Sequence, residues 1–340
     1  MMQNNKSINI YGSTGQIGGK TINLIHKYFP EIKINLLLAN KNSKKLIYQA
    51  NIFNPKAICI IDESKIVDLK KNIKNKKIKI IHYNDLFEYV KSTKSDYSLL
   101  SISGYNALNF ISPIFSTSKI VGIVNKECIV SAGHLINSLI KKNKIKIFPL
   151  DSEHFSLFNF FENLNKINIS DIQNIFLTAS GGPFLKKKFN EIKNASYAQA
   201  LKHPKWIMGY KNSIDSATMS NKCLEIIEAH YLFNIPFKKL KIVIHPQALI
   251  HSIIEYSNST SNLNYFFHDM NIPIFNFLSY LNNNNHSKNK FNYPFDLNSK
   301  LDFLSPQNSQ FPVMKLFNKI NKNEPINLIK FNCANEFSVN

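Results

Sequence analysis

Short hydrophobic runs alternate with amphipathic stretches along the first half of the chain. The runs have the length of buried parallel strands, and the stretches between them place hydrophobic residues at helical spacing, as at Ile17, Leu24 and Tyr28. This alternation predicts an α/β fold with a doubly wound parallel sheet. The expected strands lie at 8–11, 34–39, 57–61, 78–81, 98–102, 120–124 and 145–150.

The pattern changes after residue 150. Hydrophobic runs at 174–178, 240–245, 250–256 and 262–267 predict strands, and two helical segments lie among them. Strands grouped in this way favour an α+β domain with a largely antiparallel sheet. The asparagine-rich stretch at 282–289 is typical of a linker.

Three glycines, Gly12, Gly15 and Gly18, form the turn after the first expected strand. Glycine lets the backbone turn tightly there and lets a pyrophosphate approach the start of the next helix. A P-loop would need glycine in place of Thr14, and the strict dinucleotide motif would need glycine in place of Ser13. The remaining G-x-x-G-x-x-G variant, between a strand and a helix, indicates a Rossmann-like dinucleotide site. A purely structural glycine turn is the alternative.

The end of the second expected strand indicates which dinucleotide fits. Enzymes that bind NAD place an acidic residue there for the ribose hydroxyls. This chain instead has Asn40, Lys41 and Asn42, followed by Lys44 and Lys45. Because this segment carries lysines and lacks an acidic residue, it favours binding of the additional phosphate of NADP(H).

The charge of the chain narrows the choice of partners. The formal net charge is +20, and the basic residues are all lysines spread over the whole sequence. Proteins that read nucleic acids usually use arginine for phosphates and bases, so we expect no nucleic-acid partner. A positive field still attracts an anionic small-molecule substrate.

The sequence also indicates a compartment. No hydrophobic run approaches the ~20 residues of a membrane span, so we expect no membrane partner. The first residues are polar and lack a secretory signal. Four scattered cysteines suit free thiols in a reducing cytosol, which predicts a cytoplasmic protein.

Two carboxylates follow directly after the run at 145–150. If the extended backbone continues, Asp151 and Glu153 point to one face, because side chains alternate along a strand. Two such carboxylates repel each other and are costly to bury, and a divalent cation removes that cost. Hard oxygen ligands suit Mg²⁺ or Mn²⁺. A solvated acidic turn is the alternative.

Two further segments suggest a binding site. Residues 178–184 place Ser180 and two glycines after an expected strand, which is typical of an anion cradle; an ordinary tight turn is the alternative. Residues 203–209 hold the only tryptophan, Trp206, between a proline and a glycine. Such a segment suits a lid that excludes water, or a tryptophan packed into the core.

A helix is expected from about residue 213, because N-cap residues lead into a helical pattern. Asn221, Lys222 and Glu225 would share one face of it. A helical Lys–Glu pair is usually a surface ion pair, but beside two other carboxylates this face could bind a phosphate and complete a metal site. Glu228, one turn further on, is the alternative metal ligand.

Together these motifs resemble the 1-deoxy-D-xylulose 5-phosphate reductoisomerase family. The resemblance implies an NADPH- and divalent-metal-dependent enzyme of non-mevalonate isoprenoid synthesis, and a homodimer. The enzyme would rearrange 1-deoxy-D-xylulose 5-phosphate and reduce the product to 2-C-methyl-D-erythritol 4-phosphate, with Mg²⁺ or Mn²⁺, or Co²⁺ as a third candidate. The matching segments occur in the family's order at 12–18, 125–127, 150–154, 180–184, 203–209, 215–225 and 245–247.

The resemblance also implies roles for single residues. The metal would be bound by Asp151, Glu153 and Glu225, which with Lys126 and His203 form the expected catalytic set. The substrate would be contacted by Lys126, Ser152, Glu153, His203 and Glu225, and its phosphate by Ser180, Ser216, Asn221 and Lys222. The NADPH site would be lined by Gly12, Thr14, Gly15, Gln16, Ile17, Asn40, Lys41, Asn42, Asn125, Glu127 and Gly209. Trp206 and Met208 would lie on a closing loop.

The resemblance gives the expected organisation of the chain. A Rossmann-like NADPH-binding domain would span 1–149, and a catalytic domain for metal, substrate and dimerisation would span 150–272. A linker at 273–304 would lead to 305–340. Residues 332–336 resemble the start of the family's C-terminal helical domain, so this last part is expected to be an incomplete form of it with exposed hydrophobic surface. A truncated, non-catalytic relic of the enzyme is the alternative function.

Overall fold

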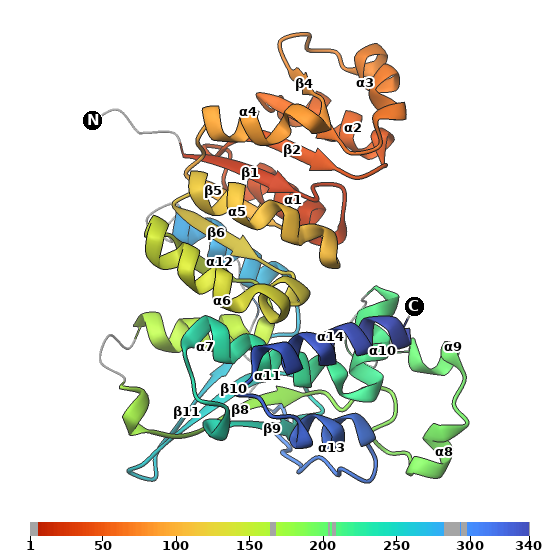
Figure 1. The fold of residues 1–340 in the computed structure, drawn as a ribbon, viewed down its shortest axis with the longest axis vertical. Helices are drawn as coiled ribbons and strands as arrows, with labels where there is room; N and C mark the ends of the chain where they lie inside the picture. The colour runs from red at the N-terminus through yellow and green to blue at the C-terminus, as the bar shows by residue number, and fades with distance from the viewer. Residues whose placement is uncertain are drawn as a thin grey trace. The chain divides into compact units, whose positions relative to one another are not determined.

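The computed structural model describes residues 6–163, 168–202, 205, 209–281, 293 and 298–339. The chain forms two compact units (Figure 1). Unit 1 comprises Met1–Cys128, His134–Asp151 and Met270–Asn292, and unit 2 comprises Ile129–Gly133, Ser152–Asp269 and Tyr293–Asn340. Among the described residues, no helix is both long and hydrophobic enough to cross a membrane.

Unit 1 is built on a seven-stranded sheet in which every neighbouring pair is parallel. The order is β4-β3-β2-β1-β5-β6-β7, so the winding reverses between β1 and β5, and the predicted doubly wound α/β fold is confirmed. Open sheets of this kind bind ligands at the carboxyl ends of the strands near such a reversal. The strands are β1 (Ser7–Tyr11), β2 (Lys33–Ala39), β3 (Ala57–Ile60), β4 (Lys79–Ile81), β5 (Tyr97–Leu100), β6 (Ile120–Ile123) and β7 (Lys146–Pro149).

The strands of unit 1 read as hydrophobic runs because helices cover the sheet, and residues such as Ile10, Leu37 and Leu99 are fully buried. One of these helices returns from late in the sequence. The helices are α1 (Gln16–Tyr28), α2 (Ser43–Phe53), α3 (Ile66–Asn72), α4 (Leu86–Ser92), α5 (Leu108–Thr117), α6 (Lys126–Asn143) and α12 (Asn271–Leu281).

Helix α12 departs from the expected linker at 273–304. Its hydrophobic side chains Ile274, Phe277 and Leu278 are fully buried, and the helix packs against α1. Phe277 lies where a Cβ on Gly122 of β6 would stand, so the sheet and the helix fit closely. A linker is therefore wrong for residues 273–281, because their side chains complete the core of unit 1. The asparagine-rich stretch at 282–289 lies outside the described residues.

Unit 2 contains a four-stranded sheet in the order β11-β10-β8-β9. It is largely antiparallel, as expected, and only β8 and β9 pair in parallel. Helices α7 and α11 cover one face, where Ile175, Leu177 and Ile254 are fully buried (Figure 1). The strands are β8 (Ile172–Ala179), β9 (Leu240–Ile244), β10 (Ile250–Tyr256) and β11 (Ser261–Tyr265); the helices are α7 (Ser152–Asn163), α8 (Phe189–Lys193), α9 (Tyr197–Ala200), α10 (Tyr210–Thr218), α11 (Ser220–Phe233), α13 (Pro312–Lys319) and α14 (Pro325–Val339).

The last two helices of the described chain pack against α11. Their shared core includes the rings of Phe317 and Phe331, whose centroids lie 5.2 Å apart. Their outer surface exposes Leu316, Ile326 and Phe337, the last at 88%. Hydrophobic side chains are therefore exposed on this segment.

Candidate active site

The glycine turn between β1 and α1 is held in place by the neighbouring strand. The backbone N–H groups of Gly12 and Ser13 both donate to the Leu38 carbonyl, at 3.0 and 2.9 Å. Gly12 has a positive φ of 89°, and a Cβ on Gly18 would lie 2.3 Å from the Gly12 carbonyl oxygen. The helix therefore starts in direct contact with the turn, which leaves its first N–H groups near the carboxyl ends of the strands, where a pyrophosphate binds.

A basic depression lies beside the end of β2. Its lining includes Lys41, Lys44 and Lys65, and its acid Asp68 accepts a hydrogen bond from Ser43 at 2.7 Å. Asn42 caps α2 by accepting from the Lys45 backbone N–H at 3.0 Å. The Lys45 ammonium in turn donates to the Thr14 carbonyl at 2.9 Å, so the two turns of the expected cofactor site are tied together.

Asn125 connects the loop after β5 to the start of α6. Its side-chain oxygen accepts from the Cys128 backbone N–H at 2.6 Å, and its amide group donates to the carbonyls of Ile102 and Gly104 at 2.7 and 3.0 Å. Glu127 is buried on the first turn of the same helix. The expected cofactor residues thus lie at the ends of β1, β2 and β6 in unit 1, except Gly209, which is the N-cap of α10 in unit 2.

The carboxylates after β7 do not lie on a continuing strand. Helix α7 begins at Ser152, so Glu153 occupies its first turn, where the helix dipole favours an acid. The expected alternation of side chains is therefore wrong, but the expected cluster still forms. Oxygens of Asp151, Glu153 and Glu225 all lie within 4.8 Å of one another, a spacing that one metal ion could bridge.

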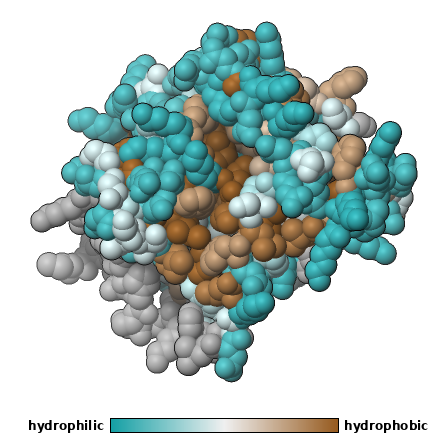
Figure 2. Space-filling model, turned by 90° about the horizontal axis from the view of Figure 1, so that it is seen from below, coloured by the Kyte–Doolittle hydropathy of each residue, from teal (hydrophilic) through white to brown (hydrophobic). Residues whose placement is uncertain are grey.

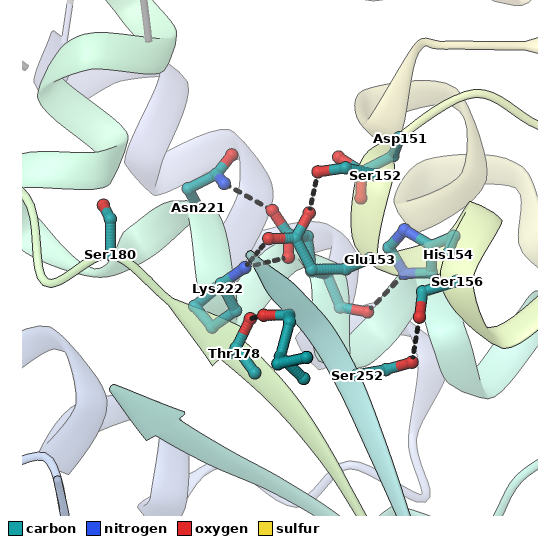
Figure 3. A network of polar contacts seen from close by, with 12 residues as sticks. Asp151, Ser152, Glu153, His154, Ser156, Thr178, Ser180, Asn221, Lys222 and Ser252 are labelled. Atoms are coloured by element: carbon teal, nitrogen blue, oxygen red, sulfur yellow. Dashed lines mark hydrogen bonds and ion pairs between the residues drawn. The ribbon is translucent and has the colours of Figure 1, made fainter. Parts of the chain in front are cut away.

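Lys222 lies against two of these carboxylates (Figure 3). Its ammonium nitrogen is 2.8 Å from Glu153 Oε1 and 2.5 Å from Glu225 Oε2, and only 4% of the residue is exposed. Ser152 donates to Glu153 at 2.6 Å, and Asn221 donates to Glu225.

The Lys126 ammonium is 2.6 Å from Asp151 Oδ2. The cluster therefore sets two ammonium groups against three carboxylates. The remaining negative charge and the hard oxygen donors fit a divalent cation such as Mg²⁺ or Mn²⁺.

A buried histidine lies beneath this cluster. His154 Nδ1 is 3.3 Å from Glu228 Oε2, and Nε2 is 3.0 Å from the Glu225 backbone carbonyl. Neither side chain is more than 1% exposed. Glu228, the alternative metal ligand in the sequence, thus pairs with His154, while Glu225 faces Asn221 and Lys222. No role was expected for His154 from the sequence, and the signal that could have found it is a histidine directly beside the acid pair.

The expected phosphate-binding groups lie around the start of α11. Gly181 and Gly182 after β8 both have positive φ, and the Ser180 hydroxyl accepts from the Gly182 N–H at 3.3 Å. A Cβ on Gly182 would lie 2.9 Å from the Ser216 carbonyl oxygen, so this loop packs tightly on α10. Figure 3 shows Ser180 and Asn221 on the same side of the carboxylates. His203, Trp206 and Met208 lie outside the described residues.

The 245–247 motif has a structural role in unit 2. His245 Nδ1 donates to the Asp302 carbonyl at 2.8 Å, its ring stacks on Phe303, and Gln247 donates to the Asp302 carboxylate at 2.8 Å. Leu304, the residue after Phe303, forms a β-bridge with Ile244. Burial lowers the pKa of His245, which favours the neutral ring. The motif therefore ties residues 302–304 to the edge of the sheet.

The chain is similar to known proteins over most of its length. Three family models match the chain, described as 1-deoxy-D-xylulose 5-phosphate reductoisomerase at residues 8–133, its C-terminal domain at 147–233, and DXP reductoisomerase C-terminal domain at 267–340. A reductoisomerase from Pelagibacter ubique is 39% identical over 323 residues, covering 94% of this chain and 82% of that relative. The chain belongs to the 1-deoxy-D-xylulose 5-phosphate reductoisomerase family.

Other family members are similar at the level of sequence and structure. The reductoisomerase of Wolbachia pipientis from Culex pipiens is 38% identical over 98% of this chain and 85% of its own length. The Zymomonas mobilis reductoisomerase in complex with NADPH superposes with a TM-score of 0.87 at 31% identity, covering 98% of this chain and 86% of that one. A reductoisomerase solved with NADPH, fosmidomycin and magnesium gives a TM-score of 0.88 at 31% identity, covering 98% and 84%.

Proposed function

We propose that this protein converts 1-deoxy-D-xylulose 5-phosphate to 2-C-methyl-D-erythritol 4-phosphate, a step of non-mevalonate isoprenoid biosynthesis. It is an NADPH- and divalent-metal-dependent oxidoreductase of the reductoisomerase family. The observation that carries this proposal is the group of three carboxylates, Asp151, Glu153 and Glu225, next to serine, asparagine and lysine side chains that suit a phosphate. The solved relatives with NADPH and with magnesium support the same cofactors.

Asp151, Glu153 and Glu225 would hold the metal, which would polarise the carbonyl and hydroxyl oxygens of the substrate when bound. The protein's own side chains would do the positioning. Lys126 orients Asp151 through their 2.6 Å contact, and Ser152 orients Glu153 by donating a hydrogen bond.

The phosphate would be bound by Ser180, Ser216, Asn221 and Lys222. Since the Lys222 ammonium already contacts two carboxylates, its charge would link the metal ligands to the phosphate. We assign His203 to the substrate as well, on the match of its motif alone. Binding the phosphate remote from the reacting carbons would orient the substrate for rearrangement.

NADPH would bind along the carboxyl edge of the sheet in unit 1 and supply the hydride when bound. The glycine turn offers N–H groups to the pyrophosphate, and the lysines after β2 offer cations to the additional phosphate of NADPH. We assign this site to Gly12, Thr14, Gly15, Gln16, Ile17, Asn40, Lys41, Asn42, Asn125, Glu127 and Gly209.

The direct test is oxidation of NADPH by the purified 340-residue chain with 1-deoxy-D-xylulose 5-phosphate. We expect turnover with Mg²⁺, Mn²⁺ or Co²⁺, none with a chelator, and product identified as 2-C-methyl-D-erythritol 4-phosphate. Asp151→Asn is expected to lose activity, while Asp62→Asn, at an exposed loop acid, keeps it. A protein that binds NADPH but turns over with none of these metals is the non-catalytic relic, and the proposal fails.

We also propose a homodimer formed through the open face of the unit 2 sheet. Ile253 pairs in register with Phe176 and Leu263, so three hydrophobic side chains form a row across β8, β10 and β11. Leu263 is 48% exposed, and Figure 2 shows hydrophobic side chains gathered in the middle of the face seen from below. Light scattering should give twice the chain mass, and Leu263→Glu should give monomers. Val67→Glu, at an exposed site in unit 1, is the control.

We place the enzyme in the cytoplasm. None of the four cysteines forms a disulfide, and burial raises the pKa of Cys59 to about 12, which keeps that thiol protonated and unreactive. Fractionation of the source cells should recover the activity with cytoplasmic markers; recovery with membranes would contradict this assignment.

A further inference from the structure

The last helix, α14, contacts α10 through charged and polar groups within unit 2. The Lys211 ammonium of α10 lies 2.6 Å from Asp215 Oδ2 on the same helix and 2.8 Å from Glu336 Oε1 on α14. Asn335 of α14 donates to Asp215 Oδ1 at 2.8 Å. Asp215 is 1% exposed and Glu336 is 9% exposed, so these contacts are shielded from water. None of these four side chains takes part in the proposed chemistry.

Further contacts fix α14 itself. Asn332 is fully buried and donates to the Ser131 hydroxyl at 3.2 Å, in the part of α6 that belongs to unit 2. Leu328 and Phe331 are buried on the same helix. Exposed ion pairs contribute little to stability, but breaking a buried pair leaves an uncompensated charge. The contact between α14 and α10 is therefore expected to hold both helices in one arrangement.

Helix α10 lies next to the expected phosphate-binding groups. Ser216 directly follows Asp215, and its carbonyl lies against Gly182 of the loop that carries Ser180. At the same end, three residues after Ser216, α10 joins α11 through Met219 alone, a buried residue with a φ of 67°. A shift of α10 would therefore change the spacing of Ser216 from Ser180 and from the start of α11.

We propose that Asn335 and Glu336 are positioning residues for the substrate's phosphate. They hold Asp215 and Lys211, which fix α10, and α10 sets the place of Ser216 between the glycine loop and α11. The inference rests on the proposed function, because the phosphate site is assigned there. It adds a role for the last helix, which touches neither substrate nor cofactor in this proposal.

Glu336→Gln and Asn335→Ala test this role. Glu336→Gln removes the charge that faces Lys211, and Asn335→Ala removes the hydrogen bond to Asp215. We therefore expect the KM for 1-deoxy-D-xylulose 5-phosphate to rise about tenfold in each variant. The kcat should stay within about threefold, and the KM for NADPH should not change. Glu324→Gln, which removes a similar charge from the exposed residue just before α14, should leave all three constants unchanged. A variant that lowers kcat at an unchanged substrate KM would indicate general misfolding and contradict positioning.

A double variant tests the path from α14 to α10. Lys211→Met combined with Glu336→Gln should raise the substrate KM no more than the worse single variant, because both changes break the same network. Independent effects that multiply would overturn the inference.

Thermal protection by inorganic phosphate gives a readout without turnover. Phosphate should raise the melting temperature of the wild type and raise that of Glu336→Gln much less. Phosphate could protect the wild type more than Glu336→Gln while the wild type shows no turnover with any metal. In that case the proposed function fails and the positioning role stands. Equal protection of both proteins, or no protection of the wild type, overturns the positioning role.

Discussion

Replacing Lys222 with methionine should destabilise the metal-free protein strongly. The ammonium lies 2.8 and 2.5 Å from Glu153 and Glu225 and is almost fully buried, and Met fills similar space without charge. Removing one partner of a buried ion pair costs about 3–5 kcal/mol. Because the Glu153 side chain keeps 14% exposure and its bond from Ser152, we expect the lower end, about 3 kcal/mol.

A loss of about 3 kcal/mol corresponds to a fall in melting temperature of roughly 6–12 °C for a unit of this size. The same variant leaves its carboxylates with more negative charge, so it should bind Mn²⁺ more tightly than the wild type. At 100 times the Kd, a ligand restores about 2.7 kcal/mol.

Calorimetry of metal-free and Mn²⁺-saturated protein would measure both effects, with the exposed Lys238→Met as control. A metal-free melting temperature within about 2 °C of wild type would refute the reasoning. The reasoning would equally be refuted if saturating Mn²⁺ did not reduce the difference in melting temperature between the variant and the wild type.

Three further predictions concern other parts of the molecule. Gly18→Ala should weaken NADPH binding at least about tenfold in a fluorescence titration, because its Cβ would lie 2.3 Å from the Gly12 carbonyl oxygen. Gly19→Ala should bind NADPH normally, because its Cβ would contact only the flexible end of the Lys45 side chain. Glu228→Ala should lower the melting temperature more than Glu228→Gln, since only glutamine keeps a polar group of similar shape against the buried His154; equal losses would show that the pair contributes nothing. The pKa of His245 is lowered by burial, so the contribution of its neutral ring to stability is complete above about pH 6.5 and is lost as the pH falls below that value. In melting curves recorded over a pH series, His245→Gln should reduce this loss of stability at low pH. An unchanged loss in the variant would contradict the prediction.

The sheet of unit 1 was predictable because its strands are buried on both faces and therefore read as hydrophobic runs. The carboxylate cluster was predictable for a different reason, since burying several acids together nearly demands a cation. The path of the backbone at these acids was not predictable. The pattern at Asp151 and Glu153 fits a strand as well as a helix start, and only the packing of α7 on the sheet decides between them.

Tertiary contacts also decided where Glu228 and α12 lie. Sequence spacing placed Glu225 and Glu228 one turn apart and left both as metal ligands. In the structure Glu225 groups with Asp151 and Glu153, whereas Glu228 groups with Asp151 and His154, which lies on another helix. The asparagine-rich stretch predicted a linker that also took in the hydrophobic residues just before it. These residues pack into a domain that begins more than two hundred residues earlier. Contacts of such long sequence separation leave no local signal.

The return of α12 to unit 1 also orders events during synthesis. Phe275 packs on Tyr28 and Phe29, with ring centroids 5.5 and 5.1 Å apart, and Phe277 closes over β6. While the ribosome is still making unit 2, the nascent Rossmann-like sheet lacks this cover and shows hydrophobic surface to chaperones. The cofactor-binding unit therefore completes its hydrophobic core only after residues 152–269 of unit 2 have been made.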